Sequence, residues 1–346
     1  MMTSIERVVK TLKGEPVDRL PVYPLINSVS RKAIGISYEE WTKDYKKCAE
    51  AIIKTTDELG VDVICTLVDL SVEAADFGQE LLYFEDKAAC PNHKNRLIKS
   101  EEDYEKIKYV DPRTSPRMSE HIAMAKLLYD ARGQEKPIVG FVLGPLAILS
   151  MMRGQAEMFM DCIDEPELLE APLKEITRTL IDFCDGLIDA GCHALMFDTL
   201  YASASIMSPQ MWDGLEGDFI EEICNHVHSR GCMVMLHNCG TGIYFAEQIK
   251  RMNPCLISFL HTPFDCKDLA DTKEKYGRKI TLMGALEPGL VLGATEDELR
   301  AMCQEQIDIL GKDGHFVLAT GCEYPAPLDF EKARVMVDVA CTYGKA

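Results

Sequence analysis

The chain has 346 residues, of which 47% are hydrophobic and 8% aromatic, so it can bury the core of one large domain or two ordinary ones. Its 37 lysines and arginines against 56 aspartates and glutamates give a net charge of −19. This charge excludes a protein that by itself binds nucleic acid or anionic membranes, because both would be repelled. No apolar run approaches the ~18–20 residues of a membrane span, and the first residues include acidic side chains where a signal peptide is apolar, so we expect a cytoplasmic protein.

Fourteen cysteines are scattered along the chain without a CxxC pair. A chain of this length needs no disulfide scaffold, and most of these cysteines lie within apolar runs. We therefore expect most of them to pack in the core as small apolar side chains, in a protein from a reducing compartment.

Eight short apolar segments rich in β-forming residues predict eight strands. In chain order they cover 21–27, 61–69, 137–145, 193–199, 232–240, 255–261, 279–286 and 315–322. Because they are apolar throughout rather than alternating, they are typical of a parallel sheet covered on both faces. Helical patterns lie between them, over 164–190, over 295–310 after a capping-box spacing, and from about Asp329.

Eight strands, each followed by a helical segment, predict an α/β fold, a (β/α)8 TIM barrel with an N-terminal helical extension. The competitor is a doubly wound sheet with an appended domain. However, no GxGxxG motif follows a strand, and no linker rich in Pro, Gly or Ser divides the chain. We therefore expect 1–346 to be a single domain in which the polar stretch of about 78–136 is a surface insertion after the second strand.

In such a barrel, functional residues gather at the carboxyl ends of the strands. The polar residues at those ends are Asn27, Asp69, Asp198, His237, Cys239, His261, Glu287, Cys322 and Glu323. Each of them alone, Asp198 and Glu287 above all, is explained more simply as a cap on the following helix. Their coincidence on one rim instead predicts a functional site.

His237 and Cys239 are two residues apart on a predicted strand, so their side chains point to the same side. Cys322, at the end of the last strand, adds a second thiolate on the same rim. An imidazole and two thiolates form a ligand set for zinc, and three protein ligands leave one position for substrate or water. The alternative is that the three residues are unrelated.

The stretch HNCGTG…GRKITLMGALEPG…GHFVLATGCEYPAPLDF resembles the uroporphyrinogen decarboxylase superfamily. Within it, the chain is similar to the zinc-dependent methyltransferase branch that acts with corrinoid proteins. That branch carries HxC and a later GC cysteine, which are His237, Cys239 and Cys322 here. In VDLSVEAADFG, Asp69 stands nine residues before Gly78, the spacing of the superfamily's functional aspartate, and the VEA around Glu73 is typical of the branch.

The sequence also departs from the superfamily's decarboxylase. That enzyme carries an arginine-rich segment resembling RQAGR, whereas INSVSRKAIG offers only Arg31 and Lys32. No arginine or lysine ends a predicted strand, so a porphyrinogen with many carboxylates would be desolvated without partners. We therefore do not expect decarboxylation of uroporphyrinogen. The turn at 284–288 and the segment 258–263 differ as well, which reshapes the expected pocket.

The resemblance implies a methyltransferase that moves a methyl group between a corrinoid and a small molecule, which is either a methyl donor or a thiol acceptor. A D-x-H-x-x-G corrinoid-binding motif is absent, so the cobamide is expected on a separate corrinoid protein. By analogy with the superfamily, the chain is expected to form a homodimer. Two other functions stay open: a metal-free decarboxylase or lyase in which Asp69 stabilises a protonated intermediate, and a scaffold stabilised by a zinc ion with four ligands.

Asp69, Glu73 and Asp198 are the candidate catalytic carboxylates. We expect Asp69 to face the cavity, where it orients the substrate or hydrogen-bonds to His237. The alternative is that it caps the segment that starts at Ser71. The expected pocket also contains Asn27, His261, Glu287 and Glu323.

The fourth metal position is expected to hold water or a displaceable carboxylate, from Glu73 or Glu287 before Glu323. Since Glu323 directly follows Cys322, its side chain should point away from that thiolate. A permanent fourth cysteine or histidine, His261 above all, would make the site structural.

Overall fold

A computed structural model describes residues 2–345 of the chain, which form an α/β fold around one parallel sheet. The sheet has seven strands in the order β1-β4-β5-β6-β7-β8-β9, and every neighbouring pair is parallel. The strands are β1 (Ile64–Cys65), β4 (Ile138–Leu143), β5 (Ala194–Asp198), β6 (Met233–Asn238), β7 (Leu256–Phe259), β8 (Thr281–Leu286) and β9 (Phe316–Thr320).

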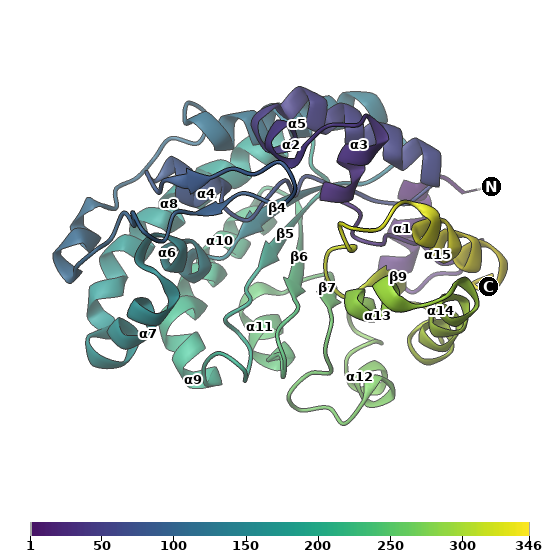
Figure 1. The fold of residues 1–346 in the computed structure, drawn as a ribbon. Helices are drawn as coiled ribbons and strands as arrows, with labels where there is room; N and C mark the ends of the chain where they lie inside the picture. The colour runs from purple at the N-terminus through teal and green to yellow at the C-terminus, as the bar shows by residue number, and fades with distance from the viewer. Residues whose placement is uncertain (1, 346) are drawn as a thin grey trace.

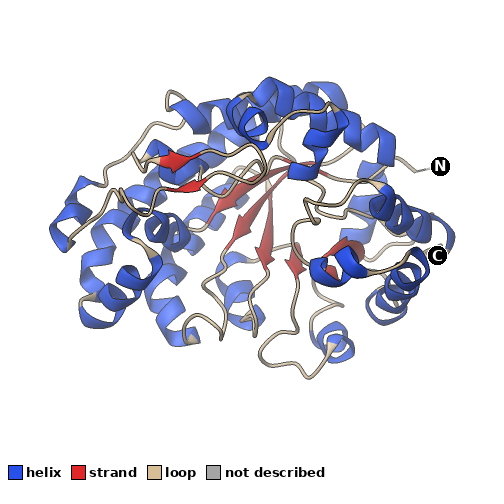
Figure 2. Cartoon of the chain, viewed as in Figure 1, coloured by secondary structure: helices blue, strands red, loops and turns tan. Residues whose placement is uncertain are grey.

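Helices surround the curled sheet on its outer side (Figures 1 and 2). The helices are α1 (Ser4–Leu12), α2 (Tyr38–Lys43), α3 (Tyr45–Leu59), α4 (Val72–Asp76), α5 (Pro116–Arg132), α6 (Pro145–Arg153), α7 (Gln155–Asp164), α8 (Glu170–Asp189), α9 (Pro209–Trp212), α10 (Asp218–Ser229), α11 (Phe245–Met252), α12 (Leu269–Lys275), α13 (Pro288–Gly293), α14 (Glu296–Leu310) and α15 (Glu331–Thr342). Short 3-10 or π-helical turns are η1 (Ser28–Ala33), η2 (Glu101–Lys106), η3 (Pro166–Leu169) and η4 (Asp213–Gly217). From β4 onward, strand and helix alternate along the chain, as predicted.

The strands are apolar throughout because both faces of the sheet are covered. All six residues of β4 and of β8 are buried. Their side chains alternate between the interior of the curled sheet and the helix layer outside. A cluster of interior side chains includes Met196, Met235 and Met283, which lie below the carboxyl ends of their strands.

The predicted first strand, 21–27, is wrong in its extent. Only Val22 forms a bridge, with Leu318 of β9. The prolines at 21 and 24 lack the N–H that a ladder needs, and Leu25 has a φ of 47°, which ends the extended backbone. The predicted strand 61–69 is likewise reduced to the two residues of β1.

The segment around Val22 nevertheless lies between the two ends of the sheet. The N–H of Tyr23 donates to the carbonyl of Leu318 in β9, at 2.9 Å. On the other side, the N–H of Asp62, just before β1, donates to the carbonyl of Val22 at 3.0 Å. The fold is therefore TIM-barrel-like, with a short irregular segment in the place of the eighth strand.

The polar stretch 78–136 differs from a simple surface insertion. It begins with a two-stranded antiparallel hairpin, β2 (Leu81–Leu82) and β3 (Cys90–Pro91), followed by η2. Its last part is α5, which packs against α3, α8 and β4 and buries Met118, Met124 and Leu128 completely. These apolar residues recur at helical spacing, but the polar residues between them concealed the pattern.

A buried ion cluster holds the chain together around the start of β1. Asp62 is fully buried, and its carboxylate accepts hydrogen bonds from Arg7 and Arg19 at 2.8 and 2.7 Å. It also accepts from the Val22 N–H at 2.9 Å and from the Ser4 hydroxyl at 2.8 Å. One carboxylate thus joins α1, the segment around Val22 and the strand that follows. Within residues 2–345, no helix is both long enough and apolar enough to cross a membrane.

We predict that Asp62→Ala lowers the free energy of unfolding by about 3–5 kcal/mol, because it leaves the buried Arg7 guanidinium without one of its anions. Urea unfolding, followed by circular dichroism, measures the loss. Asp130→Ala is the matched control: it removes an exposed pair with Lys126 and should cost less than about 0.5 kcal/mol. Equal losses for the two variants would contradict the role of the cluster.

Candidate metal centre

Three neighbouring strands carry one row of polar residues. In the parallel ladders, Asp198 of β5 is paired with His237 of β6, and His237 is paired with Ser258 of β7. Residues paired in this way project to the same face of a sheet. All three are buried, with exposed fractions of 6%, 5% and 0%. The row therefore lies inside the curled sheet, at the carboxyl end of its strands.

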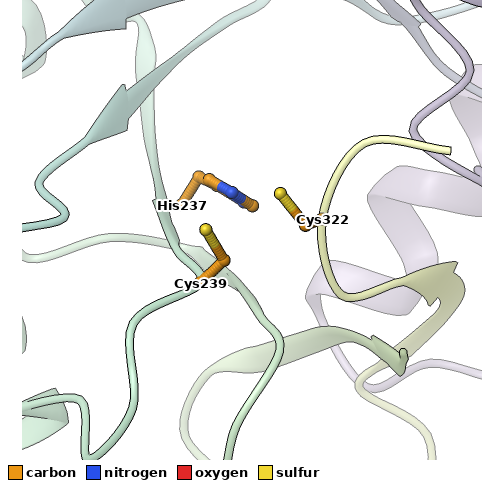
Figure 3. A group of neighbouring side chains, drawn as sticks. All are labelled: His237, Cys239 and Cys322. Atoms are coloured by element: carbon orange, nitrogen blue, oxygen red, sulfur yellow. The ribbon is translucent and has the colours of Figure 1, made fainter. Parts of the chain in front are cut away.

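Two cysteines complete a ligand cluster with His237 (Figure 3). Cys239 lies just beyond the end of β6, and Cys322 lies on the loop after β9. One ligand atom from each of the three residues lies within 4.8 Å of the other two. The side chains point toward one another in the figure, so the predicted convergence of His237, Cys239 and Cys322 is present.

The imidazole of His237 is oriented by its second nitrogen. Nδ1 lies 3.0 Å from the hydroxyl oxygen of Ser258. This contact leaves Nε2 for a metal ion, which is the usual arrangement of a ligating histidine. The expected hydrogen bond from Asp69 to His237 is wrong, since Ser258 occupies that position.

The two cysteines shift each other's pKa in opposite directions. Hydrogen bonds from the Cys239 thiol and then from His237 lower the pKa of Cys322 to about 4, although burial opposes this. The same hydrogen bond to Cys322, together with burial, raises the pKa of Cys239. A divalent cation bound between the two sulfurs would favour the thiolate form of both cysteines.

Asp198 adds a buried carboxylate beside the cluster. Its Oδ1 is buried and has no hydrogen-bond partner within the described part of the chain. Burial raises the pKa of Asp198 to about 6, and the charges of His237 and Cys322 both act on it. A carboxylate oxygen left without a partner is costly unless a cation or a substrate proton reaches it. The donor set therefore fits a soft divalent metal such as zinc.

Residues 3–343 match the sequence family described as uroporphyrinogen decarboxylase (URO-D). The chain belongs to the URO-D family.

Relatives of two kinds are found within the URO-D family. The chain is 22% identical to a protein named methylcobamide:CoM methyltransferase MtbA of Methanosarcina mazei, over 99% of this chain and 98% of the relative. It is 26% identical to a uroporphyrinogen decarboxylase of Campylobacter lari, over 71% of each chain. The sequence resemblance to the superfamily and its methyltransferase branch is thus confirmed.

Solved structures support the fold. A methyltransferase from Methanosarcina mazei superposes with a TM-score of 0.84 at 20% identity, over 99% of both chains. A B12-independent methionine synthase from Shewanella gives a TM-score of 0.58 at 13% identity, over 94% of this chain and 96% of the other. At these identities the similarity establishes the α/β fold of the URO-D chain and no more.

None of the other predicted ligands joins the cluster of His237, Cys239 and Cys322. Among residues 2–345, no further His, Cys, Asp or Glu is grouped with the three at that distance, so the histidine at 261 does not close the site. Glu73 accepts a hydrogen bond from the N–H of Leu143 at 3.0 Å, and burial raises its pKa to about 7. Glu287 is exposed before α13. The preference for Glu73 or Glu287 as the fourth ligand is therefore not supported by their contacts.

Two further predicted pocket residues are Glu323, which contacts Ser28, and Asn27, which lies in the segment 21–28 itself. Glu323 accepts a hydrogen bond from the N–H of Ser28, at 2.9 Å. Asn27 is buried, and its Oδ1 accepts from the Tyr23 hydroxyl at 2.7 Å. Its Nδ2 has no partner within the described residues, which leaves one buried donor for a substrate.

Asp69 has a partner that sequence reasoning missed. Arg117 of α5 contacts both of its carboxylate oxygens, at 2.6 and 3.2 Å. The N–H of Ser71 also donates to Asp69, at 2.8 Å, although the N-cap residue of α4 is Ser71 itself and no side chain caps that helix. Arg117 lies in the stretch 78–136, which was predicted to be a surface insertion, so the sequence did not indicate a role for it. Ser258 was also missed, although a lone polar residue inside an apolar strand is a signal that could have revealed it.

We predict that Ser258→Ala weakens zinc binding by about 10- to 100-fold, because the imidazole of His237 loses the contact that orients it. Competition with a chelator of known affinity measures the change. Ser150→Ala is the control, since that buried serine donates to the carbonyl of Ala147 and does not contact His237. Unchanged zinc affinity in Ser258→Ala would contradict the orienting role.

We predict that Asp69→Asn leaves zinc affinity unchanged but lowers the free energy of unfolding by about 3 kcal/mol, because Arg117 loses its anion in a mostly buried setting. Zinc titration and urea unfolding of the same preparation test the two parts. If zinc affinity fell while stability was preserved, Asp69 would act on the metal centre after all.

Proposed function

We propose that the protein is a zinc-dependent methyltransferase that moves a methyl group between a corrinoid on a partner protein and a small molecule. The small molecule is a methyl donor or a thiol acceptor, and the direction of transfer stays open. The observation that carries the proposal is the His237, Cys239 and Cys322 cluster, which has two sulfurs and no fourth protein ligand among the described residues. A site with three protein ligands keeps one position for substrate.

The relatives support this choice over decarboxylation. The methylcobamide:CoM methyltransferase is matched over almost its whole length, whereas the uroporphyrinogen decarboxylase is matched over 71%. A metal-free lyase would use Asp69 to stabilise a protonated intermediate. Here that carboxylate already pairs with the Arg117 guanidinium, so its charge is largely neutralised before any substrate binds.

Zinc, when bound at the three residues, would act as a Lewis acid that lowers the pKa of a thiol or polarises the oxygen of a methyl ether. His237, held by Ser258, and the two cysteines would fix the position of the reacting sulfur or oxygen. Asp198 would accept the thiol proton on its unpartnered Oδ1, so that the S–H bond breaks as the thiolate forms. In-line alignment with the cobalt–methyl bond would supply much of the remaining acceleration.

Two other carboxylates would act as positioning residues. Glu73 binds the N–H of Leu143 at the end of β4, and Asp69 binds Arg117 of α5. Both therefore fix the rim beside Asp198 rather than contact the cluster. The cobamide is expected to arrive on a separate corrinoid protein that docks on this rim, and homodimerisation stays a prediction.

A zinc-stabilised scaffold is the alternative from another class. A structural zinc normally has four protein ligands, and this cluster offers three. The buried Asp198 oxygen without a partner is also better explained by a site that receives a substrate than by a closed one.

We predict that the purified protein binds about one zinc per chain and that the double variant Cys239→Ala, Cys322→Ala loses both zinc and methyl transfer while keeping its fold. Metal analysis and circular dichroism give the first and third results. Methyl transfer is followed by the cobalamin spectrum, with methylcobalamin and a panel of thiols, and separately with cob(I)alamin and methyl ethers or methylamines. Cys341→Ala, a cysteine of α15, is the control.

Two outcomes would contradict the proposal. If the double variant still bound zinc stoichiometrically, the two cysteines would not be the metal ligands. A wild-type protein that binds zinc but leaves the cobalamin spectrum unchanged with every donor and acceptor would favour the scaffold.

A further inference from the structure

Asn238 lies between two of the proposed metal ligands, His237 and Cys239, at the end of β6. Successive side chains of a strand point to opposite faces, so the Asn238 amide points away from the interior that His237 faces. The amide is nevertheless completely buried, with an exposed fraction of 0%. Because a buried amide is costly unless its polar atoms are bonded, the partners of Asn238 show what it does.

The donor side of this amide binds the loop that follows β5, residues 199–205, which we call the β5 loop. Its Nδ2 donates to the carbonyl of Thr199, at 2.9 Å, and to the carbonyl of Ala202, at 3.3 Å. Thr199 directly follows Asp198, the buried carboxylate beside the cluster. The amide therefore holds the backbone at the point where the chain leaves Asp198.

The acceptor side of the same amide binds the residue that follows the ligand cysteine. The Oδ1 of Asn238 accepts a hydrogen bond from the N–H of Gly240, at 2.9 Å. The parallel ladder between β6 and β7 ends at the pair of Asn238 and Phe259, so Cys239 lies outside it. The bond to Gly240 therefore fixes the backbone of Cys239 where the pairing of the strands no longer does.

The β5 loop also contacts the segment after Cys239 directly. Ser203 and Ile243 form an antiparallel bridge, and the N–H of Ala204 donates to the carbonyl of Gly242 at 2.9 Å. A β-carbon on Gly240 would lie 2.6 Å from the Ser203 Oγ and 2.7 Å from the Ser203 β-carbon. Gly240 is not among the glycines with a positive φ, so it is the close approach of the two segments that requires a glycine there.

We propose that Asn238 is a positioning residue that fixes Cys239 as a metal ligand by fastening it to the β5 loop, and so sets the thiolate relative to Asp198. This inference rests on the metal site of the proposed function and not on the transfer of a methyl group. A set of ligands must be held to within about 0.5 Å of its productive geometry, and this amide supplies that restraint without adding charge.

The test replaces Asn238 by alanine and measures metal binding, not turnover. We expect Asn238→Ala to weaken zinc binding by about 10- to 100-fold, because Cys239 loses the bond that holds its backbone. Competition with a chelator of known affinity measures this change. With cobalt(II) in place of zinc, we expect the sulfur-to-cobalt charge-transfer absorption to fall, because one of the two thiolates is displaced. A cobalt(II) spectrum and a zinc affinity equal to those of the wild type would overturn the inference.

Gln79→Ala is the matched control, because Gln79 is a buried amide with the same kinds of bonds. It donates to the carbonyls of Glu80 and Asn95, at 2.9 and 3.4 Å, and accepts from the N–H of Leu97 at 2.9 Å. None of these bonds involves the cluster. We expect the control to be destabilised in urea about as much as Asn238→Ala but to keep the zinc affinity and the cobalt(II) spectrum of the wild type. An equal loss of metal binding in both variants would contradict the positioning role.

A second pair of variants tests the same contact without changing Asn238. Gly240→Ala should weaken zinc binding, because the added methyl group forces the β5 loop away from the segment that carries Cys239. Adding Ser203→Gly should restore most of the affinity, because it removes both atoms that the methyl group would strike. A general loss of stability would not be rescued in this way. Full zinc affinity in Gly240→Ala, or no recovery in the double variant, would contradict the inference.

A measurement on the metal-free protein separates this inference from the proposed function. Alkylation of Cys239 by iodoacetamide, followed by peptide mass spectrometry, should be several-fold faster in Asn238→Ala than in the wild type, with Cys341 as the internal reference. A faster reaction supports the positioning role even if the wild type transfers no methyl group. An unchanged rate at Cys239 would overturn that role. Circular dichroism of each variant checks the fold.

Discussion

The site depends on the register of three parallel strands. Because Asp198, His237 and Ser258 are paired across β5, β6 and β7, they must project together into the interior of the sheet. A slip of one residue in any of these ladders would turn that strand's polar side chain toward the helix layer. Two residues earlier on β5 and β6, Met196 and Met235 face the same interior and support the row from below. The apolar packing of the sheet and the chemistry of its rim are thus set by the same hydrogen bonds.

Electrostatics explains how such a row is tolerated in a chain with a net charge of −19. A buried carboxylate, an imidazole and two sulfurs lie together, and no lysine or arginine pairs with them in the described residues. Most other buried acids of the chain are satisfied locally: Asp62 by two arginines, Glu216 by the indole of Trp212 and the N–H of Leu146. Within the described residues, the His237, Cys239 and Cys322 cluster and Asp198 have no lysine or arginine partner, which is the physical reason to expect a cation there.

Much of the fold was predictable because it follows from local pattern. The strands from β4 to β9 and the helices between them are apolar segments with clear periodicity, and strand ends revealed His237, Cys239 and Cys322. Contacts between distant segments were not predictable. Arg117 reaches Asp69 across 48 residues, and Ser258 meets His237 across 21, so only the topology brings them together. The strand predicted at 21–27 is wrong for a local reason. Its apolar composition suggested a strand, but its prolines lack the N–H groups that a sheet ladder needs.

The ligands come from two distant parts of the chain, and this has a consequence for biosynthesis. His237 and Cys239 follow β6, whereas Cys322 follows β9, which is separated from them by two further strands and their helices. A nascent chain that has emerged only as far as β8 therefore presents an imidazole and one thiol, which is an incomplete coordination sphere. Tight capture of the proposed metal would have to wait until the β9 segment has been translated and docked beside β8. Insertion of the proposed metal would accordingly be a late event in the maturation of this polypeptide, and it would mark the chains whose sheet has closed.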